Sequence, residues 1–126
     1  MADNKKKVFI VEDDEFLRSL NAKKLEDAGY AVSVAVDGVS AIQMIPNEKP
    51  DLIFLDLLLP GDKDGFDVLQ EVKANAETKD IPVIVFSNLG QAEDIEKAKN
   101  LGAKDFLVKA NFTLDDVVAK IQEILK

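Results

Sequence analysis

The sequence predicts an α/β protein in which five parallel strands alternate with five helices, a (βα)5 doubly wound three-layer sandwich of strand order 2-1-3-4-5. Short apolar runs alternate with amphipathic segments along the chain, as in repeated βα units. Most of these runs are continuous, which is typical of parallel strands covered on both faces. No spacer rich in Pro, Gly or Ser interrupts the 126 residues, so we expect one domain over 1–126.

The apolar runs are expected to be the strands. Four of them (KVFIV, LIFLD, IPVIVF and DFLV) are nearly continuous, whereas AVSVAV alternates apolar and polar residues. Pro82 lies near the beginning of its run, where a missing N–H is tolerated. Asp51, at the entrance of another, is interpreted as structural. In chain order, the expected strands are residues 7–11, 31–36, 52–56, 81–86 and 105–108.

The segments between the strands carry apolar residues at helical spacing. The first, from Glu15 to Ala28, is followed by Gly29, a suitable C-terminal cap. Asp37 and Gly38 are expected to turn the chain after the second strand. The remaining expected helices cover residues 39–46, 65–75, 91–101 and a last segment capped by Thr113, with Leu114, Val117, Val118, Ile121 and Leu125 as its buried stripe.

Composition excludes several classes of function. The chain has no cysteine and no histidine, which removes thiol chemistry, the usual zinc ligand and any Ser-His-Asp triad. A net charge of −8 argues against binding to nucleic acid or an anionic membrane. The start, MADNKKK, leads into only four apolar residues (8–11), so it predicts neither a signal peptide nor a membrane span. We expect a cytoplasmic protein with a flexible N-terminus over residues 1–6.

Polar residues follow the strands at the edge where ligands bind in this flavodoxin-like arrangement. The first strand leads into Glu12, Asp13 and Asp14, although Asp14 alone is better explained as a helix cap. The third strand delivers Asp56, the fourth Ser87 and Asn88, and the fifth Lys109. Because these four strands are neighbours in the predicted order, their polar ends are expected to meet.

This combination of residue types favours phosphoryl transfer to an aspartate. Clustered carboxylates suit a hard divalent cation such as Mg²⁺. Ser87 and Lys109 can bind the oxygens of a phosphoryl group, and Asp56 can act as the nucleophile that forms an aspartyl phosphate. A carboxylate is already ionised at neutral pH, so no general base is needed.

At these residues the chain resembles the CheY-like receiver domains of two-component response regulators. The resemblance covers essentially the whole chain and implies roles for individual residues. Asp56 matches the phosphoacceptor, and Glu12 and Asp13 match the acidic pair, with Asp13 the direct metal ligand. The main-chain carbonyl of Leu58 matches a further Mg²⁺ ligand. Ser87 matches the switch hydroxyl, Lys109 the phosphate-binding lysine and Phe106 the switch aromatic. The matching stretches are VFIVEDDEFLR, DLIFLDLLLPGDKDGFDVL, IPVIVFSN and GAKDFLVKA.

The sequence departs from the family pattern in three places. The loop PGDKDG carries one residue more than the common form, so we expect the loop near the metal site to differ in shape. Ala110 replaces the usual proline after the lysine, and a cis bond to a non-proline residue costs about 2.5–4 kcal/mol, so we expect a trans bond or a strained cis one. Asn88 replaces a small residue. Leu58 and Leu89 stand where side chains tune phosphoryl lifetime, and their apolar character predicts slow dephosphorylation.

The resemblance implies a phosphorelay receiver that takes a phosphoryl group from a sensor histidine kinase or a phosphotransfer protein. Because we recognise no output segment in the sequence, we expect the signal to pass to a separate downstream protein. The receiver would act as a monomer or as a phosphorylation-dependent dimer. Catalysis would be limited to self-phosphorylation and self-dephosphorylation, so the chain is not expected to be an enzyme in the usual sense. Phe106 either rotates inward on phosphorylation or stays in the core, and both remain open at this point.

Three other interpretations compete with this one. A calcium-binding loop over PGDKDGFDVLQE would have Pro60, which offers no side-chain ligand, at its first position. A haloacid dehalogenase-like phosphohydrolase would need a second aspartate where Leu58 stands. A receiver-like module that acts by contact alone, without phosphorylation, remains open because of Asn88 and Ala110. No G-x-G-x-x-G follows the first strand, so a dinucleotide site is not predicted.

Overall fold

A computed structural model describes residues 5–126, and the flexible N-terminus expected over 1–6 lies mainly outside them. One parallel sheet runs through the molecule in the order β2-β1-β3-β4-β5, which confirms the predicted topology. The strands are β1 (Lys7–Val11), β2 (Ala31–Ala35), β3 (Leu52–Leu55), β4 (Val83–Ser87) and β5 (Asp105–Val108). The helices are α1 (Glu15–Asp27), α2 (Gly38–Glu48), α3 (Gly65–Ala74), α4 (Ala92–Asn100) and α5 (Leu114–Ile124), with a 3-10 turn over Lys109–Asn111.

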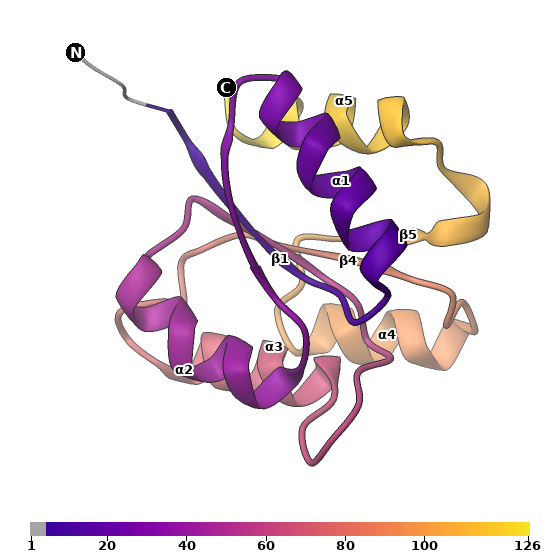
Figure 1. Ribbon diagram of the computed structural model, residues 1–126. Coiled ribbons are helices and arrows are strands. Elements are labelled where there is room, and N and C mark those ends of the chain that lie inside the picture. Colours follow the sequence, from indigo (N-terminus) through magenta and orange to yellow (C-terminus); the bar gives the residue numbers. More distant parts are fainter. Residues whose placement is uncertain (1–4) are drawn as a thin grey trace.

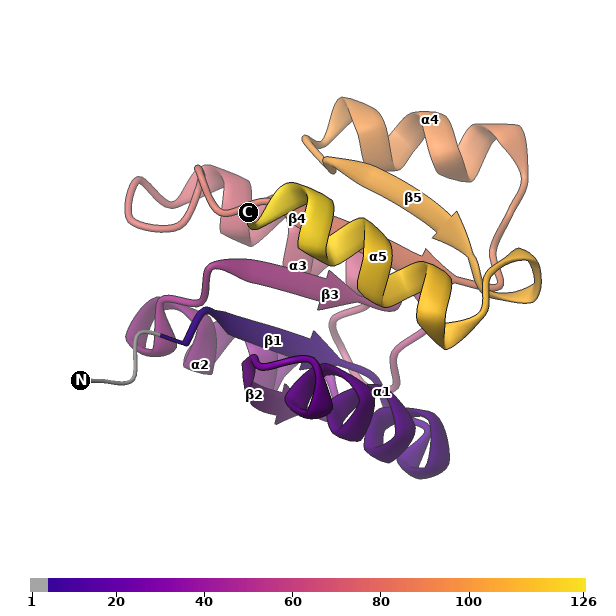
Figure 2. The same ribbon diagram turned by 90° about the horizontal axis from the view of Figure 1, so that it is seen from above.

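The helices form the two outer layers of a three-layer sandwich. Helices α1 and α5 lie together on one face of the sheet, and α2, α3 and α4 cover the other (Figures 1 and 2). Each face buries its own apolar cluster, because side chains alternate between the two faces along every strand. In β1, Phe9 belongs to the α2–α3–α4 side, whereas Val8 and Ile10 belong to the α1–α5 side.

Helix α2 differs from its predicted bounds of 39–46. It begins at Gly38, because the side chain of Asp37 accepts a 2.8 Å hydrogen bond from the N–H of Ser40 and caps the helix. It continues through Pro46, whose missing N–H removes one helical hydrogen bond near the end. It ends at Glu48, and the C-cap residue Lys49 has a left-handed φ of 46°.

The fourth strand also differs from its predicted bounds of 81–86. The N–H of Ile81 donates to the carbonyl of Thr78 at 3.0 Å, which holds Ile81 in a turn before the strand. At the other end, Ser87 pairs in register with Val108 and belongs to β4. The strand therefore carries Ser87 itself to the carboxyl edge of the sheet.

The caps predicted from sequence are confirmed at two helices. Asp14 accepts a 3.0 Å hydrogen bond from the N–H of Leu17 at the start of α1. Thr113 and Asp116 bond reciprocally at the start of α5, where Val117 and Ile121 are buried as predicted. In α1, by contrast, Phe16 is 71% exposed despite its helical spacing with buried residues.

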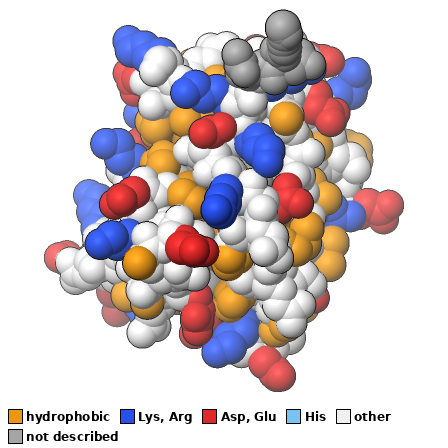
Figure 3. Space-filling view, turned by 90° about the vertical axis from the view of Figure 1, so that its left-hand side faces the viewer, with side chains coloured by type: hydrophobic (Ala, Val, Ile, Leu, Met, Phe, Trp, Pro, Cys, Tyr) orange, Lys and Arg blue, Asp and Glu red, His pale blue; other side chains and the backbone are white. Residues whose placement is uncertain are grey.

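The surface mixes charges of both signs. On the face drawn in Figure 3, Lys and Arg side chains are interspersed with Asp and Glu, and apolar side chains show only in small areas. Within residues 5–126, no helix combines the length and the apolar character that crossing a bilayer would require.

Candidate functional site

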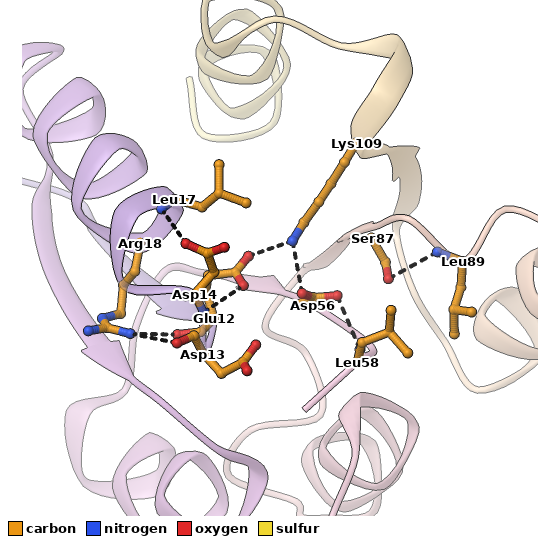
Figure 4. Close-up of polar contacts among 10 residues, drawn as sticks. All are labelled: Glu12, Asp13, Asp14, Leu17, Arg18, Asp56, Leu58, Ser87, Leu89 and Lys109. Carbon is orange, nitrogen blue, oxygen red and sulfur yellow. Dashed lines mark hydrogen bonds and ion pairs between the residues drawn. The ribbon is translucent and has the colours of Figure 1, made fainter. Parts of the chain in front are cut away.

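Four neighbouring strands deliver polar side chains to the same edge of the sheet (Figure 4). Glu12 and Asp13 follow β1, Asp56 follows β3, Ser87 ends β4 and Lys109 follows β5. The parallel ladder continues past the strands: the N–H of Asp56 donates to the carbonyl of Val11 at 3.0 Å. This bond fixes the backbone of Asp56 beside the acidic pair.

Lys109 joins two buried carboxylates. Its Nζ lies 2.7 Å from Oε1 of Glu12 and 2.9 Å from Oδ2 of Asp56. The side chains of Glu12, Asp56 and Lys109 are 4%, 5% and 12% exposed, so all three are largely withdrawn from water. The carboxylate of Asp56 at the end of an apolar strand is therefore paired, as burial of a charge requires.

Burial and pairing shift two pKa values at this site. Burial raises the pKa of Glu12, and the charge of Asp56 adds to the rise, while the hydrogen bond from Lys109 opposes it. Burial would lower the pKa of Lys109, but its hydrogen bonds to Glu12 and Asp56 outweigh that effect and raise it. The lysine therefore remains charged and offsets part of the acidic charge.

The three acidic residues form a cluster with the chemistry of a cation site. One carboxylate oxygen each from Glu12, Asp13 and Asp56 lies within 4.8 Å of the others. Glu12 and Asp56 are buried, whereas Asp13 is exposed and so faces solvent, from which an ion would enter. An all-oxygen donor set of this kind fits a hard divalent cation such as Mg²⁺.

Leu58 holds Asp56 from the other side. Its N–H donates to Oδ1 of Asp56 at 3.1 Å, so the two oxygens of that carboxylate have different partners. Leu58 is 52% exposed, and its side chain lies beside Asp56 (Figure 4).

Ser87 lies beside this cluster (Figure 4) but joins none of its hydrogen bonds among the described residues. Ser87 is fully buried, and its Oγ accepts a long 3.4 Å hydrogen bond from the N–H of Leu89. Phe106 is half-buried and packs on the α2–α3–α4 side of the sheet. In this structure, the ring of Phe106 therefore forms part of the core.

The segment after Lys109 resolves one question left by the sequence. The Lys109–Ala110 peptide bond is trans, as expected for a residue other than proline, and residues 109–111 form a 3-10 turn. The backbone therefore leaves β5 through this turn before α5 begins. Asn88, the other departure from the family pattern on this side, is exposed.

Arg18 is a site-positioning residue that the sequence analysis did not single out. Its Nη1 donates to the carbonyls of Glu12 at 3.1 Å and Asp13 at 3.3 Å (Figure 4). These bonds fix the backbone of the acidic pair from the first turns of α1. The feature of the sequence that could have indicated this role is a basic residue about one helical turn beyond the Asp14 cap.

The calcium-loop alternative is wrong. Residues 65–71, its second half, form the first turns of α3, and the segment follows β3 instead of a helix. An EF-hand loop would need that stretch to wrap around an ion.

Comparison with known proteins identifies the family. The family model of the response regulator receiver domain matches residues 8–122. The chain belongs to this receiver domain family. The CheY-like resemblance is thus confirmed, and the contact-only alternative is not favoured.

Related receivers agree in sequence and in fold. The DNA-binding dual master transcriptional regulator RpaA of Synechocystis sp. is 38% identical over 120 residues, which are 95% of this chain and 49% of that protein. The probable transcriptional regulator ycf27 of Cyanophora paradoxa is 35% identical over 126 residues, 100% of this chain and 51% of that protein. The receiver domain described here spans about half the length of these relatives.

Solved structures include close matches to the whole fold. A putative response regulator from Chloroflexus aurantiacus matches with a TM-score of 0.88 and 30% identity, covering 97% of this chain and 98% of that one. The Mn²⁺-bound form of response regulator Rcp1 matches with a TM-score of 0.79 and 30% identity, covering 94% and 91%. The BeF3-activated receiver domain of Klebsiella pneumoniae RstA matches with a TM-score of 0.87 and 28% identity, covering 96% and 99%.

Proposed function

We propose that Asp56 of this receiver domain accepts a phosphoryl group from the phosphohistidine of a sensor histidine kinase or a phosphotransfer protein. The observation that carries the proposal is the position of Asp56: a buried carboxylate held by Lys109 and Leu58 beside two further acids. These 126 residues contain no histidine, so the phosphohistidine donor lies outside them.

Mg²⁺ is the proposed cofactor. Glu12, Asp13, Asp56 and the main-chain carbonyl of Leu58 would hold it, and an ion there would offset charge on the attacking and transferred oxygens. The acidic cluster supports this assignment, and so does the related Rcp1, whose structure holds Mn²⁺.

The chain's own residues position the reaction. An oxygen of Asp56 forms a bond to phosphorus as the P–N bond of phosphohistidine breaks, and the electron pair of that bond returns to the imidazole nitrogen. Leu58 fixes the orientation of the carboxylate through its N–H. Lys109 already lies against Asp56 and would exchange that contact for an oxygen of the phosphoryl group.

The signal would leave through a change in conformer populations on the α4–β5–α5 side. Ser87 would turn its hydroxyl from Leu89 toward the phosphoryl group, and the half-buried ring of Phe106 would follow into the space released. Phe106 has no hydroxyl to satisfy, so an inward position needs no hydrogen-bond partner. A downstream protein, or a second copy of the chain, would recognise the altered face.

The decisive experiment is intact-protein mass after incubation with acetyl phosphate, with and without Mg²⁺. We expect a gain of one phosphoryl group that requires Mg²⁺ and is lost in Asp56→Ala. The matched control is Asp51→Ala, since Asp51 flanks the same strand at the opposite edge and accepts from the N–H of Lys7. Phosphorylation that persists in a folded Asp56→Ala variant would refute the assignment.

If acetyl phosphate does not phosphorylate the protein, a second measurement tests the site directly. Beryllofluoride imitates the phosphoryl group, and we expect it to bind in the presence of Mg²⁺ and to shift the amide resonances around Ser87 and Phe106. A folded protein that takes up neither reagent, nor phosphoryl from a phosphohistidine donor, would be a contact module.

A further inference from the structure

Two glycines at the first positions of helices lie in unusually close contact with the backbone near the proposed phosphoryl site. Gly38 begins α2 and Gly65 begins α3. Neither has the positive φ found at Gly29, Gly61 and Gly102, so backbone conformation does not require glycine at either helix start. Glycine is required at these positions because a Cβ would overlap neighbouring backbone atoms.

Gly38 packs on the loop that leaves Asp56. A Cβ at Gly38 would overlap the carbonyl oxygen of Lys63 and would lie 2.9 Å from both its carbonyl carbon and its Cβ. The obstructing atoms are mainly backbone, which cannot rotate aside as the end of a flexible side chain can. A side chain at residue 38 would therefore displace Lys63 and the loop around it.

That loop is held at both of its ends. At its beginning, the N–H of Leu58 donates to Asp56 at 3.1 Å. At its end, the N–H of Gly65 donates to the carbonyl of Leu57 at 3.0 Å, and an added Cβ there would overlap the backbone of Asp56 and Leu57. Between these points, Asp62 is exposed and Lys63 is half-buried.

We propose that Gly38 is a positioning residue for the metal and phosphoryl site. By admitting the Lys63 carbonyl against the first turn of α2, it fixes the middle of the loop that carries the proposed carbonyl ligand of Leu58. Gly38 touches neither the ion nor the phosphoryl group and acts through Lys63. The inference rests on the proposed function, because it assumes that Leu58 contributes to a Mg²⁺ site.

The test compares Mg²⁺ affinity with stability, since a purely structural role would change only stability. We expect Gly38→Ala to weaken Mg²⁺ binding, measured by calorimetric titration, by about 10-fold or more, the usual effect of losing an outer support of a metal site. The control is Gly29→Ala, which strains a φ of 104° at a position with no atom within 4 Å of an added Cβ. It should lose stability in urea without changing Mg²⁺ affinity.

A second variant tests the same point without adding bulk at Gly38. One glycine inserted between Asp62 and Lys63 leaves Lys63 free to pack on Gly38 but disconnects that contact from Leu58. Surface loops tolerate such insertions, so the variant is expected to fold and to bind Mg²⁺ about 10-fold more weakly.

The outcomes separate this inference from the proposed function. If the wild-type protein binds Mg²⁺ and either variant, when folded, binds it with wild-type affinity, Gly38 has no positioning role and the proposed function stands. If the wild-type protein does not bind Mg²⁺, both are refuted. A folded Gly38→Ala variant with weakened binding, beside a Gly29→Ala control with wild-type binding, would establish the inference.

Discussion

Lys109 Nζ lies 2.9 Å from Oδ2 of Asp56, across 53 positions of sequence, and this ion pair is almost closed to water. The same ammonium group also reaches Glu12 at 2.7 Å. One cation therefore balances two buried carboxylates, while Asp13 remains at the surface of the cluster. The arrangement leaves an excess of negative charge that a divalent ion would offset.

Lys109→Gln is expected to destabilise the protein by about 3 kcal/mol in the absence of Mg²⁺, because it leaves two buried carboxylates without their cation. This is the lower end of the range for a broken buried pair, since 12% of the Lys109 side chain remains exposed. Urea unfolding measures the loss. Added Mg²⁺ should reduce it, and an equal loss with and without Mg²⁺ would show that the ion does not share the charge-balancing role.

Mg²⁺ is expected to stabilise the wild-type protein but not Asp13→Asn. At a concentration about 100 times the Kd, binding to the folded state alone adds about 2.7 kcal/mol to the free energy of unfolding. Asp14→Asn is the matched control: it also removes one negative charge, but at a residue that caps α1 through the N–H of Leu17. Equal Mg²⁺ stabilisation of both variants would place the ion elsewhere.

Asn21→Leu is expected to stabilise the protein by about 1–3 kcal/mol. The Asn21 side chain is 2% exposed, and neither its amide nitrogen nor its carbonyl oxygen has a partner among the described residues. Leucine has a similar volume and no polar atoms to satisfy. The measurement is urea unfolding, with Asn21→Asp, expected to be destabilised, as the comparison. A loss of stability in Asn21→Leu would show that the amide is hydrogen-bonded after all.

The charge of Asp37 is expected to support α2 only above acidic pH. The hydrogen bond from the N–H of Ser40 lowers the pKa of Asp37 below its ordinary value. A lowered folded-state pKa means that the contribution is present above the unfolded value and is lost as the pH falls through the folded one. The unfolding free energy of wild type relative to Asp37→Asn should therefore decrease toward acid. A difference independent of pH would mean that the charge contributes nothing.

The aspartyl phosphate is expected to hydrolyse slowly. Leu58 is half exposed beside Asp56, and Leu89 is partly buried beside Ser87. Both side chains are apolar, so neither can hydrogen-bond an attacking water. Loss of the phosphoryl group can be followed by intact-protein mass over time. Leu58→Asn should hydrolyse faster than wild type, and wild-type hydrolysis within seconds would contradict the expectation.

The sequence was sufficient for the architecture but not for every boundary. Continuous apolar runs predicted the parallel strands, because a strand buried on both faces needs apolar residues throughout. The strand order was predicted from the doubly wound arrangement that alternating strands and helices favour. The predicted helix over 39–46 was too short at both ends, since α2 begins at Gly38 and continues beyond Pro46 to Glu48. The exposure of Phe16 could not be predicted either, since helical spacing alone does not show which residues of α1 contact the sheet.

Residue types and their positions after the strands determined which side chains could serve the proposed site, and the structure brings Glu12, Asp13, Asp56 and Lys109 together as predicted. Only the tertiary structure decided how they are paired. Contacts between residues far apart in the chain depend on the register of the sheet and the space between elements, which local sequence does not encode. For that reason, the Lys109 bridge to Glu12 and the packing of Gly38 on Lys63 emerge only once the elements are assembled.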